Sequence, residues 1–230
     1  MSNPVLAAPA NAMSAPMSEQ DAIWSRITWR IVPIVLVAYV MAFLDRINVG
    51  YAKLTMQQDL QFSDEVYGLG AGIFFITYLL FEVPSNLWME KVGARRTLLR
   101  IMVLWGLAST ATAWVTTPAQ FYIVRLLLGA FEAGFFPGII LYLTYWFPSA
   151  RRGRVTGWFM FGMPITGVIG GPLSGWILKT FDGTGGWHGW QWVFVIEGIP
   201  TVLIGIAVYL LLTDRPEQAK WLSAHEKAVV

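Results

Sequence analysis

The sequence predicts an all-α membrane protein with six transmembrane helices, arranged as two inverted three-helix repeats. Hydrophobic residues make up 56% of the 230 residues and charged residues only 13%, whereas soluble domains carry roughly 25% charged residues. Runs without Asp, Glu, Lys or Arg reach 24 residues at 101–124 and again at 155–178, which is long enough to cross a bilayer. Lysine and arginine residues also cluster in alternate connections between the apolar runs.

Composition also excludes several classes of function. The net charge of +2 is too small for a nucleic-acid-binding surface, so we expect no nucleic acid partner. Because the sequence has no cysteine, disulfide frameworks, thiol catalysis and thiolate metal sites are ruled out. The sequence shows neither a His/Asp metal cluster nor a Ser/His/Asp array. We therefore predict no cofactor, no metal and no enzymatic activity.

Each predicted span is a run of mostly apolar sequence bounded by charged or turn-forming residues. A spanning helix needs about 20 such residues, whereas membrane strands would appear as alternating segments of about 10 residues. The expected helices cover residues 30–51, 66–89, 98–116, 119–145, 155–178 and 190–212. Helices 1–3 and helices 4–6 then cross the membrane in opposite senses, as inverted repeats do.

The distribution of positive charge predicts the orientation, because basic residues concentrate in cytoplasmic connections. Of the 16 Lys and Arg residues, 12 lie in the connections on one side and 2, Lys53 and Lys179, on the other. The basic side holds Arg26, Arg30, Lys91, Arg95, Arg96, Arg100, Arg151, Arg152, Arg154, Arg215, Lys220 and Lys227. We therefore expect a multi-pass protein of the cell membrane, in a bacterium the inner membrane, with both ends of this chain in the cytoplasm.

Two terminal segments flank the predicted bundle. Residues 1–22 are rich in Ala, Pro, Ser, Asn and Met, and they lack the basic start and apolar core of a signal peptide. We predict a disordered cytoplasmic tail at 1–22, a six-helix transmembrane bundle at 23–213, and the start of a central cytoplasmic loop at 214–230.

Six ionisable side chains fall inside the predicted spans, where a charge at a helix centre costs roughly 2.5–3.5 kcal/mol. They are Asp45, Arg46, Glu82, Arg125, Glu132 and the shallower Glu197. Such residues usually face a bundle interior or a water-filled cavity and mark a substrate or ion pathway. A structural ion pair that locks two helices is the alternative. Two acids and two arginines on only the first and fourth helices favour a pathway.

Helical geometry limits how these charges can pair. Arg125 and Glu132 share a helix face but lie about 10.5 Å apart along the axis, too far for a direct ion pair. Asp45 and Arg46 are neighbours and point about 100° apart. The hypothesis is that Asp45 pairs with Arg125, and Arg46 with Glu132, across a cavity between the first and fourth helices.

Glycines also recur every four residues in the fifth helix, at positions 167, 171 and 175. Since glycine has no Cβ, such a face lets another helix approach closely. We expect a close helix contact there.

Several segments resemble the motifs of one transporter superfamily. The loop Asn86-Leu-Trp-Met-Glu90-Lys91-Val-Gly93-Ala-Arg95-Arg96 is similar to the G-x-L-x-D-R-x-G-R-R signature of the major facilitator superfamily, with Gly93 and Arg95 matched. Five further segments resemble motifs of the anion:cation symporter family within this superfamily. They are Phe43-Leu-Asp-Arg-Ile-Asn-Val-Gly50, Glu82-Val-Pro-Ser-Asn86, Arg125-Leu-Leu-Leu-Gly129-Ala-Phe-Glu132-Ala-Gly134-Phe-Phe-Pro137-Gly138, Trp192-x-Phe-x-x-Glu197-Gly198-x-Pro200 and Asp214-Arg-Pro216-x-x-Ala-Lys-Trp221-Leu. Together these segments span most of the chain.

This resemblance implies the amino-terminal six-helix half of a major facilitator fold, one that moves small organic anions coupled to protons or other cations. In bacterial members of the family, an Asp-Arg pair on helix 1 and an Arg/Glu pair on helix 4 serve substrate binding and proton coupling. Carried over, Arg46, Arg125 and Tyr78 bind the substrate, and Asp45 and Glu132 couple protons.

The resemblance also assigns a gating loop, which corresponds here to Glu90, Lys91, Gly93 and Arg95. Glu82 and Glu197 are interpreted as structural. Some sugar-acid carriers have an amide on helix 5, where this chain has Phe161-Gly-Met163-Pro164. The apolar stretch favours a less polar acid.

The superfamily fold has two six-helix bundles with the substrate between them, and this chain ends after the sixth predicted helix. We therefore expect four partners: a small organic anion, a proton, the lipid bilayer and a C-terminal six-helix half. Alternatives remain open. They are a six-helix protein that dimerises to rebuild the cavity, a pH-independent facilitator, and a non-transport membrane sensor or assembly module.

Overall fold

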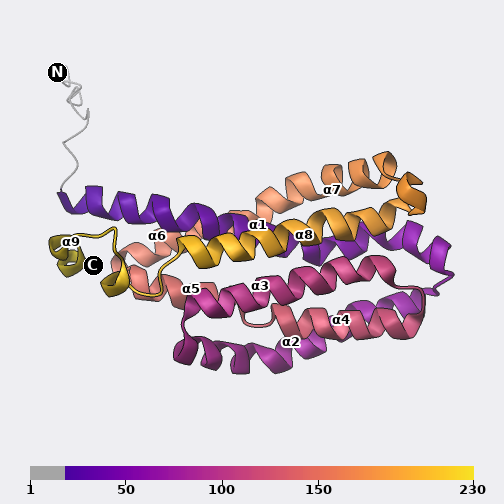
Figure 1. Cartoon of the computed structure of the whole chain (residues 1–230), viewed down its shortest axis with the longest axis horizontal. Helices are drawn as coiled ribbons and strands as arrows, with labels where there is room; N and C mark the ends of the chain where they lie inside the picture. The colour runs from indigo at the N-terminus through magenta and orange to yellow at the C-terminus, as the bar shows by residue number, and fades with distance from the viewer. Residues whose placement is uncertain (1–18) are drawn as a thin grey trace, which may run out of the picture.

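A computed structural model describes residues 19–230, and within this range every regular element is a helix (Figure 1). Six helical segments are long and apolar enough to cross a membrane. The chain is thus a multi-pass, all-α membrane protein, as predicted. The expected tail at 1–22 lies mostly outside the described residues, and residues 19–22 already belong to the first helix.

The helices follow the predicted order, with some spans longer and two divided. Their bounds are α1 Glu19–Leu60, α2 Asp64–Val92, α3 Ala94–Ala111, η1 Thr112–Trp114, α4 Pro118–Glu132, α5 Phe135–Trp146, α6 Ser149–Met160, α7 Gly162–Thr180, η2 Thr184–Gly186, α8 Gly189–Leu211, η3 Pro216–Gln218 and α9 Ala224–Val229. The start of α1 and the short α9 lie at the same end of the bundle, which we call the terminal end (Figure 1).

The fourth span breaks in the middle, between α4 and α5, where the sequence predicts one continuous helix. Gly134 caps α5 with a φ of 86°, a left-handed conformation that glycine adopts without strain. A Cβ on Gly134 would also lie 2.6 Å from the side chain of Ser85 on α2. The chain therefore turns here while α2 and the fourth span stay in close contact, and Glu132 becomes the last residue of α4.

The fifth span divides in the same way, into α6 and α7, at Phe161. The expected glycine face makes only part of its contact: a Cβ on Gly171 would lie 3.5 Å from the Tyr51 hydroxyl of α1, but a Cβ at Gly167 or Gly175 would meet no atom within 4 Å. The close approach to α1 lies on the adjoining face instead. A Cβ on Gly170 would come 2.8 Å from Ile47.

Helix packing follows the two-fold relation expected of inverted repeats. α1 packs against α7 and α8, while α4 packs against α2 and α3, and α3 packs against α8. Exchanging the first three spans for the last three converts the contacts of α1 into those of α4, and it converts the α3–α8 contact into itself. The central α3–α8 contact is close because Gly106 and Gly198 face each other, and a Cβ on Gly106 would lie 2.8 Å from the Gly198 carbonyl oxygen.

The segment after α8 folds back onto the terminal end of the bundle. The Tyr142 hydroxyl and the Trp146 indole N–H donate hydrogen bonds to the Thr213 carbonyl, over 3.0 and 3.2 Å. Trp221 stacks on Trp146 with ring centroids 5.7 Å apart. Residues 214–222 are therefore packed against α5, rather than extending away from it.

Gly134→Ala should lower the free energy of unfolding by about 1–2 kcal/mol, the typical cost of a left-handed conformation for a residue with a Cβ. The contact with Ser85 adds to this loss. Gly153→Ala is the matched control, because Gly153 lies inside α6 with open space around it. Thermal unfolding in detergent measures both, and equal melting temperatures for the two variants would contradict the assigned backbone turn.

Candidate functional site

An ion pair joins the first and fourth spans at the middle of the bundle. Arg46 Nη2 on α1 contacts Glu132 Oε1 at the end of α4, so this half of the predicted pairing is confirmed. The Glu132 side chain is 3% exposed, whereas that of Arg46 is 29% exposed. A buried carboxylate is therefore neutralised by an arginine that can still be reached from outside.

Aromatic rings surround the Arg46 guanidinium. Its Cζ lies 5.1 Å from the ring centroid of Tyr78 on α2, 5.4 Å from that of Phe43 and 5.7 Å from that of Phe74. A cation within about 6 Å of a ring face is attracted by the ring's quadrupole. Arg46 is thus held in place by rings as well as by Glu132.

A cavity of about 230 Å³ opens beside this pair. It is lined by Tyr39, Ala42, Phe43, Arg46, Tyr78, Glu132, Phe135, Phe136, Met160 and Met163. The structure therefore brings three predicted site residues, Arg46, Tyr78 and Glu132, to one cavity. Most of the apolar lining was not predicted from the sequence, because an inward-facing aromatic residue and a lipid-facing one look alike in an apolar span.

Asp45 does not pair with Arg125, so that half of the hypothesis is wrong. Asp45 is 6% exposed and does not line the cavity. It accepts hydrogen bonds from Ser109 on α3 at 2.7 Å, Asn48 at 3.1 Å and Thr201 on α8 at 3.2 Å. The physical reason is the angle of about 100° between neighbouring helical side chains. With Arg46 directed at α4, Asp45 must face α3 and α8.

The buried guanidinium of Arg125 instead has its contacts on α2. Its Nε donates to the Gly70 carbonyl over 3.2 Å, and its Cζ lies 4.8 Å from the Phe74 ring. Phe74 thus contacts both Arg125 and Arg46. Arg125 does not line the cavity that contains Arg46.

The predicted gating loop is organised by an acid that the sequence analysis did not single out. Gly93 connects α2 to α3 with a φ of 97°, and a Cβ there would lie 2.9 Å from the Asp214 carboxylate. Asp214 accepts a hydrogen bond from the Arg95 backbone N–H at 2.8 Å, and the Arg95 guanidinium donates to the Tyr209 carbonyl. Glu90 and Lys91 are exposed.

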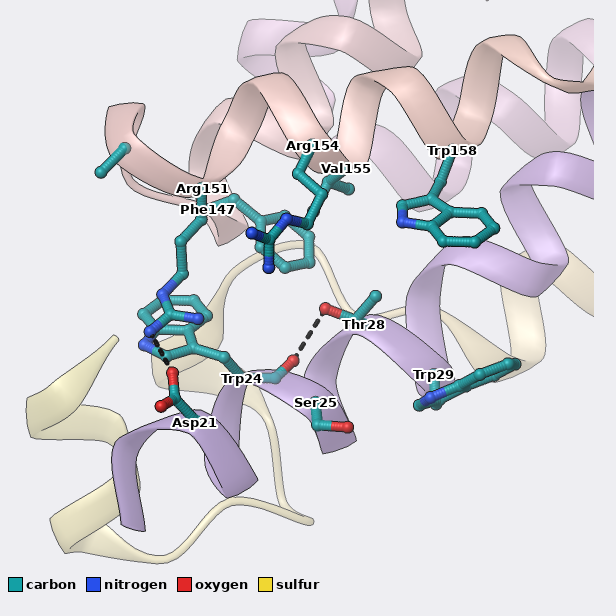
Figure 2. A pocket seen from close by; sticks show the side chains of 11 residues that line it. Asp21, Trp24, Ser25, Thr28, Trp29, Phe147, Arg151, Arg154, Val155 and Trp158 are labelled. Atoms are coloured by element: carbon teal, nitrogen blue, oxygen red, sulfur yellow. Dashed lines mark hydrogen bonds and ion pairs between the residues drawn. The ribbon is translucent and has the colours of Figure 1, made fainter. Parts of the chain in front are cut away.

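A second, larger cavity of about 670 Å³ lies at the terminal end, between α1 and α6. Figure 2 shows Arg154 extending into it, while Arg151 turns toward Asp21, which it contacts at 2.7 Å. Trp29 and Trp158 are exposed beside it. Arginine and tryptophan together are typical of a membrane interface.

The fold and the buried charges define a polytopic helical bundle with ionisable side chains in its interior. The sequence model of the Major Facilitator Superfamily matches residues 35–229. Because this match covers most of the chain, the protein belongs to the major facilitator superfamily.

Two bacterial relatives show strong sequence similarity. The chain is 56% identical over 207 residues to a putative metabolite transport protein, NicT, of Pseudomonas putida, covering 90% of this chain and 47% of the relative. It is 54% identical over 202 residues to a putative tartrate transporter of Agrobacterium vitis, covering 88% and 45%. The chain thus spans about half the length of the curated relatives it matches.

A solved structure shows the same fold at low sequence identity. A bacterial homologue of the human lysosomal transporter Spinster, in an inward-facing and unoccupied conformation, matches with a TM-score of 0.74 and 19% identity. The match covers 93% of this chain and 48% of that structure. The chain therefore has the fold of one half of a major facilitator transporter.

A double-mutant cycle with Arg46→Gln and Glu132→Gln should give a coupling free energy of about 0.5–3 kcal/mol, as expected for contacting charges. The reason is that either single change leaves a largely buried partner uncompensated. The exposed pair of Arg151 and Asp21 is the control, with expected coupling of about 0.2–1 kcal/mol. Equal coupling in both cycles, measured by unfolding in detergent, would be inconsistent with a buried central pair.

Proposed function

We propose that the chain forms one six-helix bundle of a proton-coupled symporter for a small organic anion with a carboxylate group. The supporting observation is the Arg46–Glu132 ion pair, which borders a cavity between the first and fourth spans. In this proposal the substrate lies between this bundle and a second one. Both described ends of the chain face the cytoplasm, because 12 of the 16 basic residues lie on that side.

Arg46 is the anion ligand of this proposal. A guanidinium stays charged at every physiological pH, and its planar fork matches the two oxygens of a carboxylate. The Arg46 side chain is the more exposed member of the pair, so a substrate anion can reach it. Tyr78 lines the same cavity and can donate a hydrogen bond to the substrate. Arg125 stabilises the site from behind Phe74 through its positive charge.

Glu132 is the proton carrier of this proposal. When a substrate carboxylate takes Arg46, the buried Glu132 loses the charge that stabilises its ionised form. It then binds a proton more readily, so anion binding and proton binding favour each other by linkage. With the anion on Arg46 and the proton on Glu132, the loaded site carries no net charge, and the two bundles can then rearrange around it.

The cavity lining bears on the type of substrate. The named tartrate transporter among the relatives indicates an organic acid. Around Arg46, however, the lining consists mainly of aromatic and methionine side chains, including Phe136, Met160 and Met163. This lining offers few partners to hydroxyl groups, so we favour a carboxylate with an apolar or aromatic body over a polyhydroxylated one.

Glu132→Gln should abolish proton-driven accumulation while leaving exchange of labelled for unlabelled substrate, since glutamine keeps the shape but cannot carry the proton. Uptake of labelled organic acids is measured in proteoliposomes that contain the protein at its natural full length, with and without an inward proton gradient. Glu82→Gln is the control, because Glu82 borders a separate cavity and should retain accumulation.

The outcomes of this assay also separate the alternatives. Downhill uptake that ignores the proton gradient would indicate a facilitator. Binding without flux would indicate a sensor or an assembly module. Accumulation by Glu132→Gln at the wild-type level would eliminate Glu132 as the carrier.

Arg46→Gln should weaken binding of the transported carboxylate by about 10- to 100-fold, because a hydrogen bond to a charged group contributes about 1.5–3 kcal/mol. Isothermal titration calorimetry with the purified protein measures the dissociation constant. Arg154→Gln removes an arginine at the terminal end and serves as the matched control. If both variants bind as the wild type does, Arg46 is not the anion ligand.

A further inference from the structure

A second buried carboxylate lies close to Asp45, on the side of α1 away from the cavity. Glu197 of α8 is 1% exposed. Its Oε1 accepts a hydrogen bond from Ser174 of α7 at 2.9 Å. Within residues 19–230, its Oε2 is buried and has no hydrogen-bond partner. An orphaned carboxylate oxygen in the middle of a membrane protein requires an explanation.

Hydrogen-bonding side chains connect the two carboxylates. Thr201, one turn after Glu197, places its Oγ1 3.2 Å from Asp45 Oδ2 and 3.1 Å from the Glu197 carbonyl oxygen. Asn48 donates to Asp45 at 3.1 Å, and its side chain also faces Glu197. Asp45 and Glu197 therefore belong to one buried polar cluster between α1, α3, α7 and α8.

The described residues supply no positive charge to this cluster. On α1, Arg46 is directed at Glu132. On α3, Arg95 and Arg100 bind the Tyr209 carbonyl and the Ser85 hydroxyl instead, and Arg96 is exposed. The helix α8 contains no lysine or arginine. On α7, Lys179 lies in the last turn of the helix, and η1 carries no ionisable residue. One more acid, Glu132, acts on Asp45 through its negative charge, but Glu132 is itself paired with Arg46.

Electrostatics forbids two ionised carboxylates in such a place. Like charges that share a site of low dielectric constant cannot both be ionised, and an unpaired buried charge is neutralised by a proton instead. The hydrogen bonds show which group keeps its charge. Ser109, Asn48 and Thr201 place three donor groups at Asp45, which favours its ionised form. Glu197 has Ser174 as its own donor and shares Asn48 with Asp45, so its ionised form is less well stabilised.

We propose that Asp45 and Glu197 form a buried proton-binding site, separate from the Arg46–Glu132 pair, in which Glu197 carries the proton and Asp45 the negative charge. This assignment gives Glu197 a part in proton binding in place of the structural role predicted from the sequence. A contribution of this proton to coupled transport rests on the proposed function. The protonation itself does not, so it can be tested without transport.

The test is infrared difference spectroscopy of the purified protein, at its natural full length in nanodiscs at neutral pH, where a protonated carboxyl group gives a carbonyl stretch distinct from that of carboxylates. Glu197→Gln should remove one such band, and Glu82→Gln, the matched control, should leave it. In Asp45→Asn the band should still be present at neutral pH. On alkaline titration it should disappear at a lower pH than in the wild type, because the neighbouring negative charge is gone. This variant also provides the test if Glu197→Gln does not fold.

A band that survives Glu197→Gln, or an alkaline titration that Asp45→Asn does not shift, would overturn the proposal. So would a missing band in the wild type together with a melting temperature that rises on addition of sodium ions, because a metal cation would then neutralise the pair. These results are independent of uptake. A protein that shows the Glu197 band yet fails to accumulate anions would refute the proposed symport and leave the proton site standing.

Discussion

The structure depends on one constraint: every charge placed in the middle of the bundle must be neutralised or hydrogen-bonded there, since lipid offers no partner. The Arg46–Glu132 pair meets this constraint across the first and fourth spans. The turn at Gly134 places Glu132 at the end of α4, in the middle of the fourth span, while α5 continues that span. Pairing of these two charges therefore fixes where the cavity lies, and it leaves Arg46 accessible from one side.

Adjacent side chains divide the chemistry of α1 between two environments. Arg46 faces an aromatic cavity shared with α2, α4 and α5, and Asp45 faces a polar cluster with α3 and α8. Glu132 contacts the first environment directly and acts on Asp45 at longer range. The two acidic centres lie beside different faces of α1 and can thus influence each other electrostatically, although each has its own hydrogen-bond partners.

Much of the fold could be predicted from the sequence, because the length of an apolar run and the sign of its flanking charges are local properties. The Arg46–Glu132 pair was also predictable, since few opposite charges were available. The Asp45–Arg125 pair was wrong because sequence spacing does not tell which neutral donors face a carboxylate, and Ser109 and Thr201 come from distant helices. The role of Asp214 at Gly93 likewise depends on a tertiary contact.

Linkage between anion binding and proton binding is the central claim, and proton uptake on binding tests it most directly. A dye in weakly buffered solution reports the pH when a carboxylate substrate is mixed with the protein. The account predicts that protons are taken up from the medium as the anion occupies Arg46, and that Glu132→Gln abolishes this uptake. Anion binding to the wild type without any proton uptake would contradict the account.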